Sequence, residues 1–179
     1  MRRILVAWAL SFASWAAGAH SSSDAYLTLS MDPGSKADKV VVHGQWDIAL
    51  RDLDFVLPLD DDGDGQVTWG EFKRHQAAIE RYAYEKLRFS GERGSPCSIK
   101  PAHLLIDAHA DGAYAALFFD IHCLRAPKSL TMNYTLFFAI DPSHRGIFVM
   151  HAGDNTSTAV LSPQNATIAL TLDSAKTAR

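Results

Sequence analysis

The 179-residue chain lacks the features that define several specialised classes of protein. It has only two cysteines, and 21% of its residues are charged, which excludes a disulfide-dense miniprotein and a disordered polyelectrolyte. Positive charge is not in excess, because 17 Lys and Arg face 20 Asp and Glu for a formal net charge of −3. Nucleic-acid binders gain much of their affinity from cationic contacts to phosphate, so we expect no nucleic-acid partner.

Long hydrophobic runs are also missing, except at the start of the chain. Residues 4–17 are apolar apart from two serines, follow the basic pair Arg2 and Arg3, and precede the small residues 17–19. As a helix this run spans about 21 Å, which is short of the ~30 Å hydrocarbon core of a bilayer. The pattern predicts a signal peptide over residues 1–19 and a periplasmic or secreted mature chain without a transmembrane helix.

The acidic residues are concentrated in one segment. Removal of Arg2 and Arg3 with the signal peptide leaves 15 basic and 20 acidic residues, a net charge of −5. Residues 60–71 hold five acids and no base, so the rest of the mature chain is balanced. One twelve-residue segment therefore carries the whole net charge.

This segment matches the EF-hand calcium loop. Ca²⁺ takes six to eight oxygen ligands, and the loop supplies them from positions 1, 3, 5, 7, 9 and 12, with a glycine at position 6 for the sharp turn. Gly65 occupies position 6, and the ligand positions are filled by Asp60, Asp62, Asp64, Gln66, Thr68 and Glu71. A solvated acidic turn is the alternative, but five clustered carboxylates would repel one another without a cation. We therefore expect bound Ca²⁺ as the cofactor. The chain has no second loop of this type.

The remaining pattern predicts an α+β fold: an antiparallel β-sandwich-like domain over residues 20–172, with the inserted EF-hand-like loop 60–71 and one long helix over 69–87. Asp111-Gly112 between alternating segments predicts a hairpin of strands 103–109 and 114–123. Further strands are expected near residues 39–50, 130–138, 146–151, 158–161 and 167–172. Residues 173–179 are expected to form a frayed tail.

The two cysteines, Cys97 and Cys123, are an even pair in a chain predicted to be exported, so we expect a disulfide between them. Two buried thiols are the alternative. No CxxC spacing indicates a redox or zinc site.

Weaker metal candidates lie outside the acidic loop. Asp107, His109 and Asp111 alternate before the predicted turn and form either a second metal site or a set of solvated polar residues. His20 would become the amino-terminal residue and could chelate copper together with other histidines. The run 141–145 contains Asp, Ser and His, but adjacency in sequence is not triad geometry and no nucleophile elbow is present. We expect a binding or structural protein and not an enzyme.

Several short runs, residues 44–54 (GQWDIALRDLD), 68–71 (TWGE), 111–114 (DGAY) and 141–146 (DPSHRG), resemble one known family. The family is the exported amino-terminal domain of bacterial hydrogenase/urease accessory-type, nickel transporter-like membrane proteins. The resemblance implies bacterial export and the calcium loop, and in that family the domain precedes a hydrophobic membrane domain linked with nickel transport. Two functions are therefore expected: an exported calcium-binding protein or, alternatively, a periplasmic accessory that delivers nickel or copper to a membrane partner.

Overall fold

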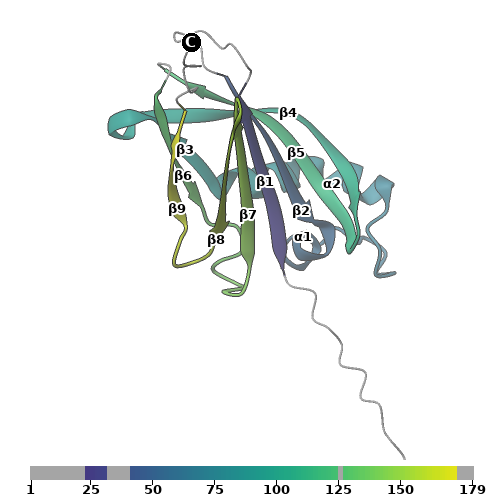
Figure 1. Cartoon of the computed structure of the whole chain (residues 1–179). Coiled ribbons are helices and arrows are strands. Elements are labelled where there is room, and N and C mark those ends of the chain that lie inside the picture. The colour runs from purple at the N-terminus through teal and green to yellow at the C-terminus, as the bar shows by residue number, and fades with distance from the viewer. Residues whose placement is uncertain (1–22, 32–40, 125–126, 173–179) are drawn as a thin grey trace, which may run out of the picture.

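The computed structural model describes residues 23–31, 41–124 and 127–172. Nine strands form one mixed sheet in the order β8-β7-β1-β2-β5-β4-β3-β6-β9, which curves into a nearly closed, barrel-like shape (Figure 1). The strands are β1 Asp24–Met31, β2 Val42–Ala49, β3 Leu87–Ser90, β4 Pro96–His109, β5 Gly112–Cys123, β6 Ser129–Tyr134, β7 Arg145–Ala152, β8 Asn155–Leu161 and β9 Thr167–Thr171. The helices are α1 Leu50–Val56 and α2 Trp69–Glu85, with a 3₁₀ turn, η1, at Glu92–Gly94.

The predicted α+β sandwich with a long helix is wrong. The protein is mostly β, with 53% strand in a single sheet, and its two helices have only 7 and 17 residues. Alternation of apolar and polar residues indicates which face of a strand is buried, as in β1. The same alternation is expected in a sandwich of two sheets and in one strongly curved sheet, so it does not distinguish these architectures. The pairing between distant strands decides between these architectures.

Strand β1 was not among the predicted strands, although it lies inside the sheet. It pairs antiparallel with β2 and parallel with β7, from Asp24 opposite Arg145 to Met31 opposite Ala152. The sheet is therefore not entirely antiparallel. Strand β4 also begins at Pro96 instead of residue 103, and the predicted helix over 69–87 ends at Glu85, so that Leu87 starts β3.

The core fills the concave side of the curved sheet, and α2 covers part of it. Phe72, Ile79 and Ala83 of α2 recur at helical spacing and are fully buried against the sheet. In Figure 1, α2 lies behind β5 and β4. The largest fully buried side chains on the strands are Trp46, Tyr114, Tyr134, Phe119 and Phe148.

The disulfide between Cys97 and Cys123 is confirmed. The two residues are direct partners in the β4–β5 ladder, with Cα atoms 4.2 Å apart. The bond fastens the end of this hairpin that is distant from its Asp111-Gly112 turn. A stable disulfide is compatible with an oxidising, extracytoplasmic compartment.

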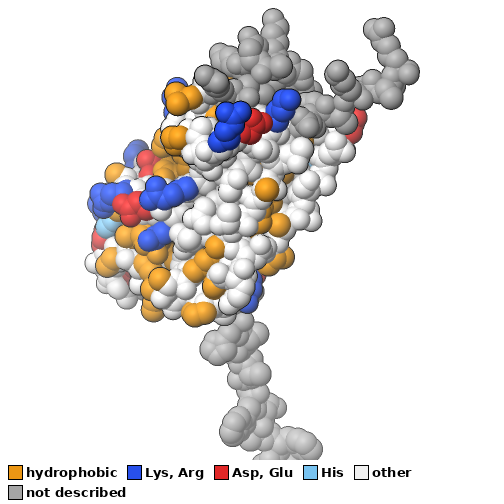
Figure 2. Space-filling model, turned by 90° about the vertical axis from the view of Figure 1, so that its left-hand side faces the viewer, with side chains coloured by type: hydrophobic (Ala, Val, Ile, Leu, Met, Phe, Trp, Pro, Cys, Tyr) orange, Lys and Arg blue, Asp and Glu red, His pale blue; other side chains and the backbone are white. Residues whose placement is uncertain are grey.

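Outside the acidic loop, the charges are mixed. On the face shown in Figure 2, basic and acidic side chains lie beside one another, among scattered apolar side chains. Among the described residues, neither helix has the length and apolar character needed to cross a membrane. The predicted signal peptide 1–19, His20 and the tail 173–179 lie outside the described residues.

Candidate metal-binding sites

The acidic loop connects α1 to α2 and lies against the tip of the β4–β5 hairpin. Arg51 of α1 donates a hydrogen bond to the Asp111 carboxylate at this tip, with 3.1 Å between Nη2 and Oδ2. A hollow of about 420 Å³ separates the loop from the tip, lined by Leu50, Arg51, Asp54, Gly65, Gln66, Val67, Asp111, Gly112 and Ala113. The hairpin tip thus faces the loop across this hollow, and Arg51 links the tip to α1.

The backbone of the loop curls around Asp60. Gly63 and Gly65 have φ angles of 75° and 84°, a left-handed conformation that glycine adopts without steric strain. The Asp60 carboxylate accepts hydrogen bonds from three amides, those of Gly63 and Gly65 at 2.8 Å and that of Asp64 at 3.3 Å. A carboxylate has about four acceptor positions, so these bonds leave about one for a cation.

Three of the predicted ligands converge. One carboxylate oxygen from each of Asp60, Asp62 and Glu71 lies within 4.8 Å of the other two. Asp64, at position 5, lies outside this group of three and accepts a hydrogen bond from the Gln66 amide at 2.8 Å. The structure thus brings together the acids at positions 1, 3 and 12.

The start of α2 positions Glu71. Thr68 caps the helix, and its amide and hydroxyl donate to Glu71 Oε2 at 2.8 and 2.6 Å, which completes a capping box. Glu71 Oε1 accepts from the Asp61 amide at 2.9 Å. The Glu71 side chain, only 3% exposed, therefore points back into the loop. Thr68, predicted as a metal ligand, acts here as the helix cap.

The loop carboxylates differ in how they are stabilised. Hydrogen bonds from the Gly65 amide and its neighbours hold the pKa of Asp60 below its usual value, and the Thr68 hydroxyl and amide do the same for the pKa of Glu71. Asp62 also accepts an amide hydrogen bond, from Asp64, but the negative charges of Asp64 and Glu71 together with desolvation raise its pKa. Asp62 is therefore a loop carboxylate whose ionisation the neighbouring acids oppose.

The fifth acid of the loop points elsewhere. Asp61 pairs with two side chains of α2, His75 at 2.8 Å and Arg74 at 2.6 Å, and these hydrogen bonds lower its pKa. Its carboxylate ties the loop to the helix and is not part of the group formed by Asp60, Asp62 and Glu71.

The predicted trio of Asp107, His109 and Asp111 does not assemble. Asp111 is bound by Arg51 and by the Tyr114 hydroxyl, which donates at 2.9 Å. Asp107 and His109 instead lie beside Asp47 of β2, and the ligand atoms of these three residues are within 4.8 Å of one another. Sequence reasoning missed Asp47 because it lies 60 residues before Asp107 and joins it only through the pairing of β2, β5 and β4.

The Asp-Ser-His run at 141–145 does not form a catalytic arrangement. Ser143 bonds to Asp141, whereas His144 is fully buried and bonds to Ser23 and to the Tyr134 hydroxyl, at 2.7 and 2.8 Å. Burial lowers the pKa of His144 to about 4, so the imidazole is neutral at pH 7.

Comparison with known proteins adds no relatives: no known family model matches the chain, and no curated protein matches it at a significant level.

Proposed function

We propose that the protein is an exported calcium-binding protein with a single EF-hand-type loop. The observation that carries this proposal is the convergence of Asp60, Asp62 and Glu71 within a loop whose sequence has an oxygen donor at every ligand position. Asp64, the Gln66 carbonyl and a hydroxyl or water at Thr68 complete the proposed ligand set. Oxygen donors of this number and charge suit Ca²⁺ better than transition metals.

The role of the ion is to neutralise the loop and to order the start of α2. A bound Ca²⁺ returns the mature net charge from −5 to −3 and removes the repulsion that raises the pKa of Asp62. Because Glu71 belongs both to the ligand set and to the capping box, metal binding and the first turn of α2 are coupled.

The proposed affinity is low. EF-hand loops in extracellular modules bind Ca²⁺ with dissociation constants of about 10⁻⁴–10⁻³ M, and this loop has no second EF-hand loop to steady it. The disulfide supports placement in the periplasm or outside the cell, where calcium at about 1 mM would fill roughly half to nine-tenths of sites of this affinity. The ion then has a structural role and does not act as a cytosolic-type sensor.

The test is calcium titration of the mature protein by calorimetry, together with Tb³⁺ luminescence excited through Trp69. This indole is 55% exposed, stacks on Phe72 and lies within the loop at position 10. We expect one site in the wild type and an affinity at least about tenfold lower in Glu71→Gln, because glutamine keeps the capping box but loses the charge.

Asp61→Asn is the matched control. It removes the same charge from the same loop, but from a carboxylate that binds Arg74 and His75, so the Ca²⁺ affinity should change by a few-fold at most. A wild-type protein without a Ca²⁺ response at millimolar concentration would refute the proposal. So would an equal loss of affinity in Asp61→Asn and Glu71→Gln.

A further inference from the structure

We propose that Asp47, Asp107 and His109 form a second metal site, which takes a first-row divalent transition metal of the Zn²⁺ type. The site combines β2 and β4 and shares no residue with the calcium loop.

The distance between one pair of ligand atoms is compatible with a metal ion. His109 Nε2 and Asp47 Oδ2 are 3.5 Å apart, longer than the 2.7–3.2 Å of an N–H···O hydrogen bond. Two ligands at 2.0–2.2 Å from a tetrahedral metal ion lie about 3.3–3.6 Å apart. The observed separation, at the long limit of a His–Asp hydrogen bond, is therefore also suited to two ligands with an ion between them.

The types of ligand select the ion. One imidazole and two carboxylates match the nitrogen and oxygen donors that bind Zn²⁺ and its neighbours, whereas Ca²⁺ requires a cage of six or more oxygens. Asp107 is exposed, so the site opens to solvent on its side. Three protein ligands leave the fourth tetrahedral position for water or for an external ligand.

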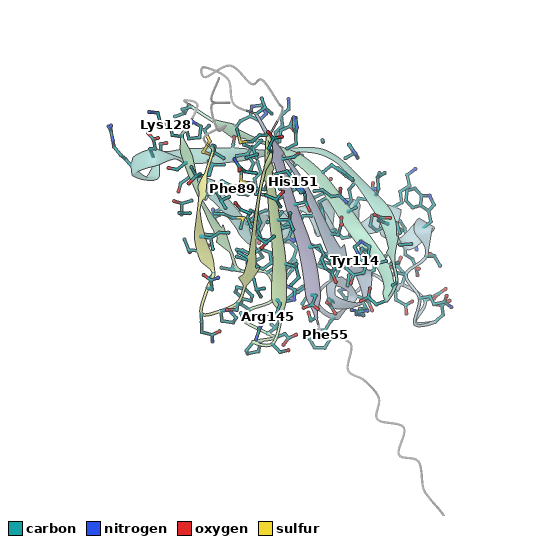
Figure 3. The ribbon with its side chains drawn as sticks, in the orientation of Figure 1. Phe55, Phe89, Tyr114, Lys128, Arg145 and His151 are labelled. Carbon is teal, nitrogen blue, oxygen red and sulfur yellow. A yellow bond between two sulfur atoms is a disulfide. The ribbon has the colours of Figure 1, made fainter. Side chains whose placement is uncertain are left out.

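The surrounding side chains hold the ligands in place. The Gln45 amide nitrogen donates to both oxygens of Asp47, at 3.0 and 3.1 Å. The His109 ring stacks on the Tyr114 ring, with centroids 4.0 Å apart. The ring of Tyr26, on the neighbouring strand β1, has its centroid 5.3 Å from that of His109. Figure 3 marks Tyr114 toward the same end of the molecule as Phe55 of α1. Such supporting contacts fix the ring orientation and the carboxylate of a metal site.

The electrostatics of the cluster favour a cation. Asp47 is only 8% exposed and lies beside a second carboxylate, that of Asp107. A buried carboxylate of this kind is costly unless it is paired with positive charge. A divalent ion would supply that charge to both acids at once.

The test is Zn²⁺ titration of the mature protein by calorimetry, with the visible absorption of Co²⁺ as a report of tetrahedral coordination. His109→Phe keeps an aromatic ring to stack on Tyr114 but has no ligand nitrogen. We expect it to lower the Zn²⁺ affinity by about 100-fold or more and to remove the intense Co²⁺ absorption, whereas Gln45→Ala should lower the affinity by about tenfold.

His103→Phe is the matched control, because His103 also lies on β4 and stacks on an aromatic ring, that of Phe118 at 4.4 Å. It should bind Zn²⁺ like the wild type. Asp107→Asn, which exchanges an exposed side chain, should also weaken binding without affecting folding, as checked by circular dichroism. Equal Zn²⁺ binding in His109→Phe and the wild type, or an equal loss in His103→Phe, would overturn the proposal.

The two metal proposals fail separately. Glu71→Gln should keep the full Zn²⁺ affinity, and His109→Phe should keep the full Ca²⁺ affinity. If Zn²⁺ binding were lost in Glu71→Gln, the ion would lie in the acidic loop and the second site would be refuted. If the wild type bound Zn²⁺ but showed no Ca²⁺ response, only the calcium proposal would fail.

Discussion

The acidic loop and the β2–β4 cluster, defined by Asp47, Asp107 and His109, are assembled in different ways. The loop takes its carboxylates from twelve consecutive residues, and backbone amides within the same segment orient them. The cluster joins residues 60 apart, which meet only because β2, β5 and β4 are neighbours in the sheet. Local backbone geometry thus builds one candidate site, and strand pairing builds the other. We therefore expect them to respond differently to changes in the sheet.

The strongest way to separate the two sites is to damage the sheet itself. Phe119 of β5 is 1% exposed, and its ring covers Gly44 on the paired strand β2. Phe119→Ala should lower the free energy of unfolding by about 3–5 kcal/mol, because it leaves a cavity between β2 and β5. Urea denaturation measures this loss, and Phe119→Leu is the milder control.

Loss of Phe119 should weaken Zn²⁺ binding more than Tb³⁺ binding in the fraction that remains folded, since only the cluster spans β2 and β4. An equal loss of both affinities would contradict the distinction between the two regions.

Removal of the disulfide tests the opposite end of the hairpin. Replacement of both Cys97 and Cys123 by serine should lower the free energy of unfolding by about 2–4 kcal/mol, chiefly by freeing the unfolded chain. Metal affinities of the folded protein should change little, because Asp107 and His109 lie near the hairpin turn. Calorimetry with each ion checks this expectation, and a large drop in Zn²⁺ affinity would argue against it.

A change of pH should also distinguish the sheet from the loop. The neutral, buried His144 has a pKa of about 4, below the value of about 6.5 for histidine in an unfolded chain. The unfolded state therefore binds one more proton between these values, and stability falls as the pH decreases from about 6.5 to 4, by roughly 2–3 kcal/mol.

Urea denaturation at several pH values measures this slope, and His144→Gln should reduce it. Asp60 and Glu71 have lowered pKa values, so their stabilising contributions are present above the unfolded carboxyl pKa and are lost only as the pH falls below about 4. Ca²⁺ binding should consequently persist at pH 5.5, weakened only through Asp62, whose pKa is raised, whereas the sheet is already less stable there. Parallel loss of both would contradict this separation.

The smallest expected effect concerns the helix cap. Thr68→Ala removes the hydroxyl that caps α2 by accepting a hydrogen bond from the Glu71 amide and that donates one to the Glu71 carboxylate. The substitution should lower the free energy of unfolding by about 1 kcal/mol. Ca²⁺ affinity should fall only a few-fold, because the carboxylate ligands remain. Thr68→Ser, which retains the hydroxyl, should behave like the wild type in both thermal unfolding and Tb³⁺ luminescence.

Sequence reasoning was most successful where the relevant contacts are local. The hairpin turn at Asp111-Gly112 and the start of α2 at Trp69 both depend on residues within a few positions of one another. The disulfide could be predicted because the chain has only one pair of cysteines. Calcium binding itself stays a prediction.

The errors concern contacts between distant segments. The alternation in β1 is regular, yet nothing local to Asp24–Met31 specifies a parallel partner 121 residues later. Asp111 looked equivalent to Asp107 and His109, but Arg51 of α1 binds it, and Asp47 takes its place in the cluster. Each outcome depends on which strands become neighbours.

The sequence by itself determined the order of oxygen donors from Asp60 to Glu71, the start of the following helix and the cysteine pair, because short-range backbone geometry and composition are sufficient for these features. Only the tertiary structure decided that the strands form one curved sheet and that Asp47 meets His109. Pairing of distant strands depends on burial and hydrogen bonding summed over the whole chain, and no short pattern of residues encodes that sum.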